Sequence, residues 1–136
     1  MADQPLTLSP GTAFFLGQAL ADWLEARGAP PEAGGPTRKV ALGRDPRLSG
    51  PSMEAAMAAG LASRGLAVAT CGLATTPAMF LACVHPAHRF DAGVMITASH
   101  LPFNRQGFKF FTSDGVFEKA DIAALLAGAT AAHAAA

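Results

Sequence analysis

Residues 92–102, Ala-Gly-Val-Met-Ile-Thr-Ala-Ser-His-Leu-Pro, decide the fold of this chain. The first five are apolar, as in a strand buried inside a sheet. Small residues follow, and Pro102 ends any regular strand, so we predict a tight, exposed loop directly after the strand. The hydroxyl of Ser99 is then expected at a strand end, with His100 beside it and Lys109 ten residues further on. A hydroxyl in this setting is well placed to carry a phosphoryl group.

Strand-like and helix-like segments alternate along the rest of the chain. Strands are expected at residues 39–43, 66–71, 92–96 and 108–111. Helices are expected at about residues 10–27, 53–65, 77–84 and 118–127. This alternation predicts an α/β fold, a three-layer α/β/α sandwich with a mixed, mostly parallel four-stranded sheet. The last two strands are joined by a short connection, so we expect them to be antiparallel.

Polar residues follow each of the first three expected strands. In a parallel sheet the carboxyl ends of the strands meet at one edge, where ligands bind. We therefore expect a common rim, where cations and helix N-termini suit an anionic group. Its residues are expected to be Arg44, Asp45, Arg47, Thr75, Thr76 and Ser99. A second interpretation stays open, in which this cluster orders the rim without touching a ligand.

The composition limits the classes of partner. The chain has 136 residues, enough for one domain, and ten basic residues balance ten acidic ones. This neutrality argues against nucleic acid or a membrane surface as a partner. No apolar run approaches the roughly 20 residues that cross a bilayer. The first ten residues contain no Lys or Arg, so no targeting segment is visible, and we expect a cytoplasmic or plastid-stromal location.

Cysteine and histidine give weaker signals. Cys71 and Cys83 lie in or beside apolar segments, so we expect buried, reduced thiols rather than a disulfide. His85 and His88 have a spacing that suits a metal ion, but no carboxylate or thiol set accompanies them. A surface loop is the preferred interpretation.

The serine loop strongly resembles that of the α-D-phosphohexomutases, the family of phosphoglucomutase, phosphomannomutase and phosphoglucosamine mutase. In this family the serine of a T-A-S-H-N-P loop is the phosphoserine that exchanges its phosphate with the sugar. Ser99 matches that serine, His100 the following histidine, and Lys109 the lysine of the N-G-x-K continuation. Leu101 and Gln106 stand where the common pattern has Asn. The T-A-S-H-L-P form is similar to a plant and algal branch.

A second motif extends the resemblance. Residues 43–49, Gly-Arg-Asp-Pro-Arg-Leu-Ser, resemble the G-R-D-x-R-x-S segment of the mutases. With a Thr-Pro pair at residues 76–77 and the serine loop, the similarity covers residues 6–128. These residues are expected to be domain I, the phosphoserine domain, without its N-terminal strand. Residues 129–136 are expected to be a disordered alanine-rich tail.

The resemblance implies roles for individual residues. Ser99 would be the nucleophile and phosphate carrier, with His100 and Lys109 as electrostatic or proton-transfer groups. Arg44, Asp45, Arg47 and Thr97 are expected to bind substrate or phosphate. A magnesium ion would be bound through the Ser99 phosphate, with its other ligands from a different domain. The substrate would be a hexose phosphate, with hexose 1,6-bisphosphate as activator.

Several parts of a complete mutase are not found in this sequence. The family's D-G-D-G-D-R metal loop, its sugar-reading loop and its distal phosphate cradle belong to three further domains. The chain is therefore expected to act with the remaining mutase domains and to be inactive alone. The alternative is a stand-alone, non-catalytic remnant that serves as a structural or binding subunit of an assembly. An unrelated nucleotide-binding domain is disfavoured because no glycine-rich phosphate loop follows a strand.

Overall fold

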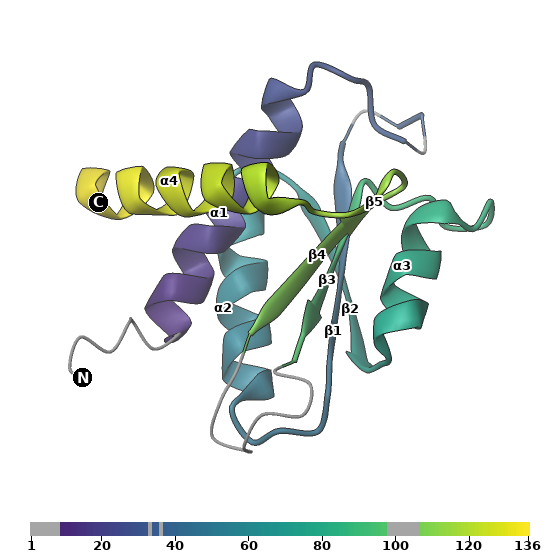
Figure 1. Ribbon diagram of the computed structural model, residues 1–136, viewed down its shortest axis with the longest axis horizontal. Coiled ribbons are helices and arrows are strands. Elements are labelled where there is room, and N and C mark those ends of the chain that lie inside the picture. Colours follow the sequence, from purple (N-terminus) through teal and green to yellow (C-terminus); the bar gives the residue numbers. More distant parts are fainter. Residues whose placement is uncertain (1–8, 33, 36, 98–106) are drawn as a thin grey trace.

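The computed structural model describes residues 9–32, 34–35, 37–97 and 107–136. The helices are α1 (Pro10–Ala26), α2 (Gly50–Ser63), α3 (Thr76–Val84) and α4 (Lys119–Ala135). The strands are β1 (Lys39–Arg44), β2 (Ala67–Leu73), β3 (Ala92–Ile96), β4 (Phe108–Thr112) and β5 (Gly115–Val116). Figure 1 shows these elements around one central sheet. The loop that carries Ser99 and His100 lies outside the described residues.

The sheet has the order β2-β1-β3-β4-β5. Strand β1 pairs in parallel with both β2 and β3, and β4 pairs antiparallel with β3. The mixed, mostly parallel arrangement predicted from the sequence is confirmed. The predicted strand count is one too low, because the chain turns after Thr112 and Gly115–Val116 pairs back onto β4. Because β1, β2 and β3 are parallel, their carboxyl ends lie at the same end of the sheet.

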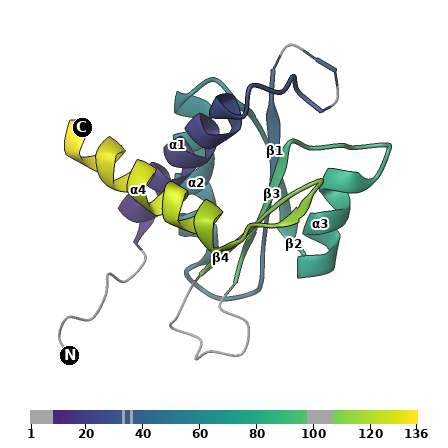
Figure 2. The same ribbon diagram turned by 45° about the horizontal axis from the view of Figure 1, so that its top comes forward.

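Helices cover both faces of the sheet and form two separate cores. The larger core lies between the sheet and helices α1, α2 and α4, and includes Leu20, Leu42 and Ile96. The smaller core lies on the α3 side and includes Ala41, Met79, Cys83, Met95 and Phe111. Figure 2 shows α3 alone on one side of the sheet and the other three helices opposite it. The three-layer α/β/α architecture is therefore present.

The helix starts follow from local chemistry. Ser9 accepts a hydrogen bond from the backbone N–H of Thr12, and Pro10 occupies the first turn, where its missing N–H costs nothing. Thr75 caps α3 in the same way by accepting from the N–H of Ala78. The Thr-Pro signal near residue 76 thus marks a helix start.

Helices α1 and α2 approach closely at two glycines. A Cβ atom at Gly17 would lie 2.6 Å from the carbonyl oxygen of Met57, and one at Gly60 would overlap the carbonyl oxygen of Phe14. Both obstacles are backbone atoms, which a side-chain rotation cannot remove. The two glycines therefore set the distance between these helices.

Replacing Gly60 by alanine should lower the free energy of unfolding by at least about 2 kcal/mol, because the methyl group forces the helices apart. Urea unfolding followed by circular dichroism measures the change. Gly11→Ala is the matched control, since its new Cβ would meet only Ser9 Oγ, at 3.7 Å. That variant should stay within about 1 kcal/mol of the original chain. Equal stability of the Gly60→Ala chain would contradict the close packing.

The C-terminal tail differs from its prediction. Residues 129–135 do not form a disordered tail but continue α4 to Ala135. Alanine has the highest helix propensity, and the helix has packing contacts here. Ala129 is buried, and the His133 ring meets Phe15 edge-on at 5.1 Å between centroids. These contacts with α1, far away in the sequence, hold the end of α4.

The prediction of buried, reduced cysteines is correct only in part. Both are free thiols, as expected. Cys83 is buried, which raises the pKa of its thiol to about 12. Cys71 is exposed, so the expected burial is wrong there, because β2 forms the outer edge of the sheet. Among the described residues, no helix is long and apolar enough to span a membrane.

Candidate functional site

The ends of β1 and β3 lie side by side and form the centre of a rim. Arg44 is paired in register with Ile96, and the N–H of Asp45 donates to the carbonyl of Ile96 at 3.1 Å. Directly after Ile96, the N–H of Thr97 donates to the carbonyl of Gly107 at 2.9 Å. The chain therefore leaves this rim after Thr97 and returns to it at Gly107. Residues 98–106, which include the predicted serine loop, connect these two points.

Asp45 links the two loops of the rim. Its Oδ2 accepts from Thr97 Oγ1 at 2.7 Å and from Arg47 Nε at 3.0 Å, while its Oδ1 accepts from the Arg47 N–H at 3.2 Å. The side chains of Asp45 and Arg47 are 18% and 11% exposed, so these contacts are well shielded from water. Three of the predicted site residues thus come together. The bonds are those expected if Asp45 braces the rim.

These contacts determine the ionisation of Asp45. Partial burial acts to raise its pKa, but the hydrogen bonds from Thr97 and Arg47 and the charge of Arg47 outweigh burial. The pKa of Asp45 is therefore held below its ordinary value of 3.8. The ionised carboxylate stabilises the fold above that value, and this stabilisation is lost as the pH falls through the lowered pKa.

Asp45→Asn should consequently destabilise the chain at pH 7, and the difference from the original chain should shrink at about pH 3. Urea unfolding at the two pH values measures this. Asp22→Asn is the control, since Asp22 forms one exposed pair with Arg64 and should change stability by less than about 1 kcal/mol. A destabilisation by Asp45→Asn of equal size at both pH values would contradict the assigned role.

Arg44 makes a separate contact, with a residue that the sequence analysis missed. Its Nε lies 3.3 Å from Glu54 Oε1, on the second turn of α2. Glu54 is buried although it is a carboxylate. One sequence signal could have identified it, because Glu54 lies on the helix face of Met53, Met57 and Leu61, which was predicted to be buried.

The remaining predicted site residues are Lys109, Ser99 and His100. Lys109 is exposed on β4, opposite Met95, and its side chain makes no hydrogen bond or ion pair to the described part of the chain. It alternates with Phe108 and Phe110, so it lies on the α3 side of the sheet. Ser99 and His100 lie outside the described residues. Their roles, and that of Lys109, stay predictions.

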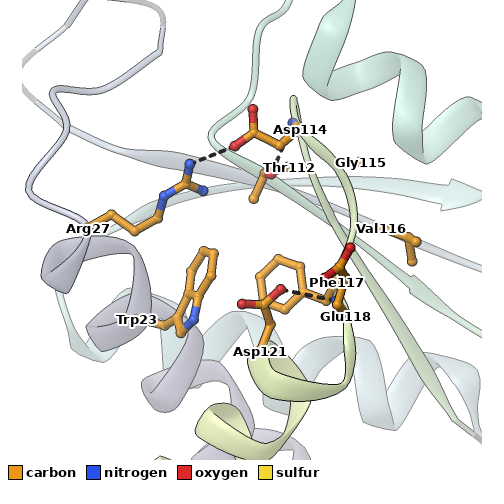
Figure 3. Close-up of a pocket in the computed structure, with 9 residues that line it drawn as sticks. All are labelled: Trp23, Arg27, Thr112, Asp114, Gly115, Val116, Phe117, Glu118 and Asp121. Carbon is orange, nitrogen blue, oxygen red and sulfur yellow. Dashed lines mark hydrogen bonds and ion pairs between the residues drawn. The ribbon is translucent and has the colours of Figure 1, made fainter.

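A cavity at the other end of the sheet, away from the rim, is lined by none of the predicted site residues. It has a volume of about 320 Å³ and lies beside the turn that follows β4 (Figure 3). Its arginine, Arg27, is already paired with Asp114 at 3.0 Å and lies 5.0 Å from the centre of the Trp23 ring. Because β4 runs antiparallel to β3, Thr112 in this cavity is at the far end of the sheet from Thr97. The cavity is distinct from the rim.

The described rim does not form a complete metal site. Among the described residues there is no group of three or more Asp, Glu, His or Cys side chains that could hold a metal ion. The two rim carboxylates, Asp45 and Glu54, are each paired with an arginine. These residues alone therefore do not fit a magnesium ion.

Comparison with known proteins gives a consistent result. The family "Phosphoglucomutase/phosphomannomutase, alpha/beta/alpha domain I" matches residues 3–134. The phosphoglucosamine mutase of Symbiobacterium thermophilum is 44% identical over 108 residues, which are 79% of this chain and 22% of that protein. The phosphoglucosamine mutase of Sodalis glossinidius is 39% identical over 115 residues, 85% of this chain and 23% of that protein.

A solved structure agrees with the sequence relatives. A phosphoglucomutase/phosphomannomutase family protein from Burkholderia thailandensis superposes with a TM-score of 0.76 and 27% identity. The match covers 96% of this chain and 28% of that one. This chain thus spans less than a third of the length of each of these three proteins. The chain belongs to the phosphoglucomutase/phosphomannomutase family, as a member of its α/β/α domain I.

Proposed function

We propose that this chain is the phosphoserine-bearing domain of a phosphohexomutase, which interconverts hexose 1-phosphates and hexose 6-phosphates through a bisphosphate intermediate. The observation that carries the proposal is the rim formed by β1 and β3. There, Thr97, which lies two residues before Ser99, donates a hydrogen bond to Asp45. In the same rim, Arg44 pairs in register with Ile96. A serine attached to this rim would have cationic side chains close to it.

In the proposed reaction, the phosphate of Ser99 passes to a hydroxyl group of the sugar phosphate. The bond from phosphorus to Ser99 Oγ breaks as the bond to the sugar oxygen forms, and the hydroxyl proton leaves to a base. The bisphosphate then turns around and returns its other phosphate to Ser99. His100 and Lys109 are proposed to supply charge or to move the proton, because phosphoryl transfer depends mainly on positioning and charge neutralisation.

The proposal includes magnesium bound through the Ser99 phosphate, with its other ligands from a different domain. Such an ion would neutralise charge on the transferred group. Arg44, Asp45, Arg47 and Thr97 are proposed to bind or order the phosphate, and hexose 1,6-bisphosphate to prime the serine. The remaining mutase domains are the expected partners, and a cytoplasmic or plastid-stromal location is part of the proposal.

An assay of the full-length protein that carries this chain tests the proposal. Glucosamine phosphate should be tested first, because several relatives are phosphoglucosamine mutases, followed by glucose and mannose phosphates. We expect bisphosphate-dependent interconversion of the 1- and 6-phosphates of one of these sugars. Absence of turnover with all three would contradict the proposal.

The alternative is a non-catalytic subunit, and one observation is compatible with either function. Strand β2 is an edge of the described sheet, and its seven residues include no charged side chain that would discourage pairing with another protein. The size of the native protein, measured by immunoblot, separates the two functions. A band at several times the mass of this chain supports a domain of a mutase. A band at the mass of this chain supports the non-catalytic subunit.

A further inference from the structure

Arg44 and Glu54 form a shielded ion pair behind the rim. The distance from Arg44 Nε to Glu54 Oε1 is 3.3 Å, and the two side chains are 23% and 11% exposed. Arg44 is the last residue of β1, while Glu54 projects from α2 beneath it. The pair therefore joins the strand end to the helix that follows it.

One oxygen of the Glu54 carboxylate receives no hydrogen bond from the described residues. Its Oε2 atom is buried and has no hydrogen-bond partner among the described residues. Burying a carboxylate is costly unless both oxygens are satisfied, and an apolar residue on this face of α2 would avoid that cost. Stability alone thus gives a poor account of a glutamate at this position.

The Arg44 side chain is restrained by Gly50 as well as by Glu54, and its terminal N–H groups remain available as hydrogen-bond donors. Its side chain crosses the first residue of α2 so closely that a Cβ at Gly50 would lie 3.1 Å from Arg44 Cδ. Only its Nε is used by Glu54, and its two terminal amino groups make no hydrogen bond to the described part of the chain. A guanidinium held at Nε presents these amino groups in a fixed orientation, which suits the oxygens of a phosphate.

We propose that Glu54 is a positioning residue that holds Arg44 at the rim, so that the terminal amino groups of Arg44 bind a phosphate group. This inference rests on the proposed function for its ligand and adds a residue to that site. Gly50 assists by leaving room for the Arg44 side chain.

Glu54→Asp is the decisive variant, because it keeps the charge and shortens the side chain by one methylene. Inorganic phosphate is titrated into the 15N-labelled chain, and the signals of the arginine side chains and the backbone amides are followed by NMR. We expect Glu54→Asp to weaken phosphate binding by about tenfold, the effect of misaligning a charge-assisted hydrogen bond. In an Arg44→Lys background, the same change should have almost no further effect.

The controls separate positioning from charge and from folding. If only charge mattered, Glu54→Asp would bind phosphate like the original chain, which would overturn the inference. An equal loss in both backgrounds would also overturn it, since Glu54 would then act independently of Arg44. If Glu54→Asp does not fold, Gly50→Ala displaces Arg44 instead, and unchanged phosphate binding by that variant overturns the inference. Lack of mutase turnover by the full-length protein would leave this comparison intact, so the two proposals can fail separately.

Discussion

Replacing Ser99 by alanine should abolish the interconversion of hexose 1- and 6-phosphates by the full-length protein that carries this chain. The alanine has no oxygen to accept the phosphoryl group, so neither transfer step of the proposed cycle can take place. Loss of a covalent nucleophile should lower kcat by roughly 10⁴-fold or more. The assay measures the interconversion of the hexose 1- and 6-phosphates, with the bisphosphate activator present.

Ser113→Ala is the matched control for this experiment. Ser113 lies in the turn between β4 and β5, at the other end of the sheet from the rim, so its removal should leave turnover unchanged. The Ser99→Ala protein should also retain its fold, as judged by circular dichroism. Full turnover by a folded Ser99→Ala protein would show that the phosphoserine assignment is wrong.

Asp91→Ala should produce the largest loss of stability among single replacements of polar residues described here. The Asp91 side chain is 2% exposed and accepts from the backbone N–H groups of Glu32, at 2.7 Å, and of Lys39, at 2.8 Å. Its Oδ1 also lies 3.8 Å from Arg38 Nη1. One carboxylate thereby ties the loop before β1 to the start of β3.

The alanine variant leaves two N–H donors and a shielded guanidinium without this partner. We expect the free energy of unfolding to fall by about 3 kcal/mol, a large part of the stability of an ordinary domain. Urea unfolding measures the loss. Asp114→Ala is the control, because Asp114 is 78% exposed and its pair with Arg27 should contribute less than about 1 kcal/mol. Similar small effects of both variants would contradict the bracing role of Asp91.

The sheet was predictable because its strands are marked by local patterns. The five apolar residues of β3 are all buried, and the short connection between β3 and β4 indicated their antiparallel pairing. The helix starts at Pro10 and Thr76 were also visible, since hydroxyl caps and proline act within one turn. These features depend on neighbours in the sequence, which sequence patterns describe well.

The features that the sequence analysis missed depend on contacts between distant residues. The end of α4 is held by α1, through Phe15 and His133, and composition alone suggested disorder there. The burial of Glu54 depends on Arg44, which lies on a different element. In the candidate site, Asp45, Arg47 and Thr97 were each named as candidates, but the sequence did not show that Asp45 is hydrogen-bonded to both of the others.

The most direct test of the central claim is to locate a phosphoryl group on the protein itself. The full-length protein is incubated with 32P-labelled hexose 1,6-bisphosphate, digested, and its labelled peptide is sequenced by mass spectrometry. We expect the label on Ser99, in the peptide containing Thr-Ala-Ser-His-Leu-Pro, and we expect it to leave when hexose 6-phosphate is added in excess. Turnover with Ser99 unmodified, or a label on another residue, would contradict the central claim.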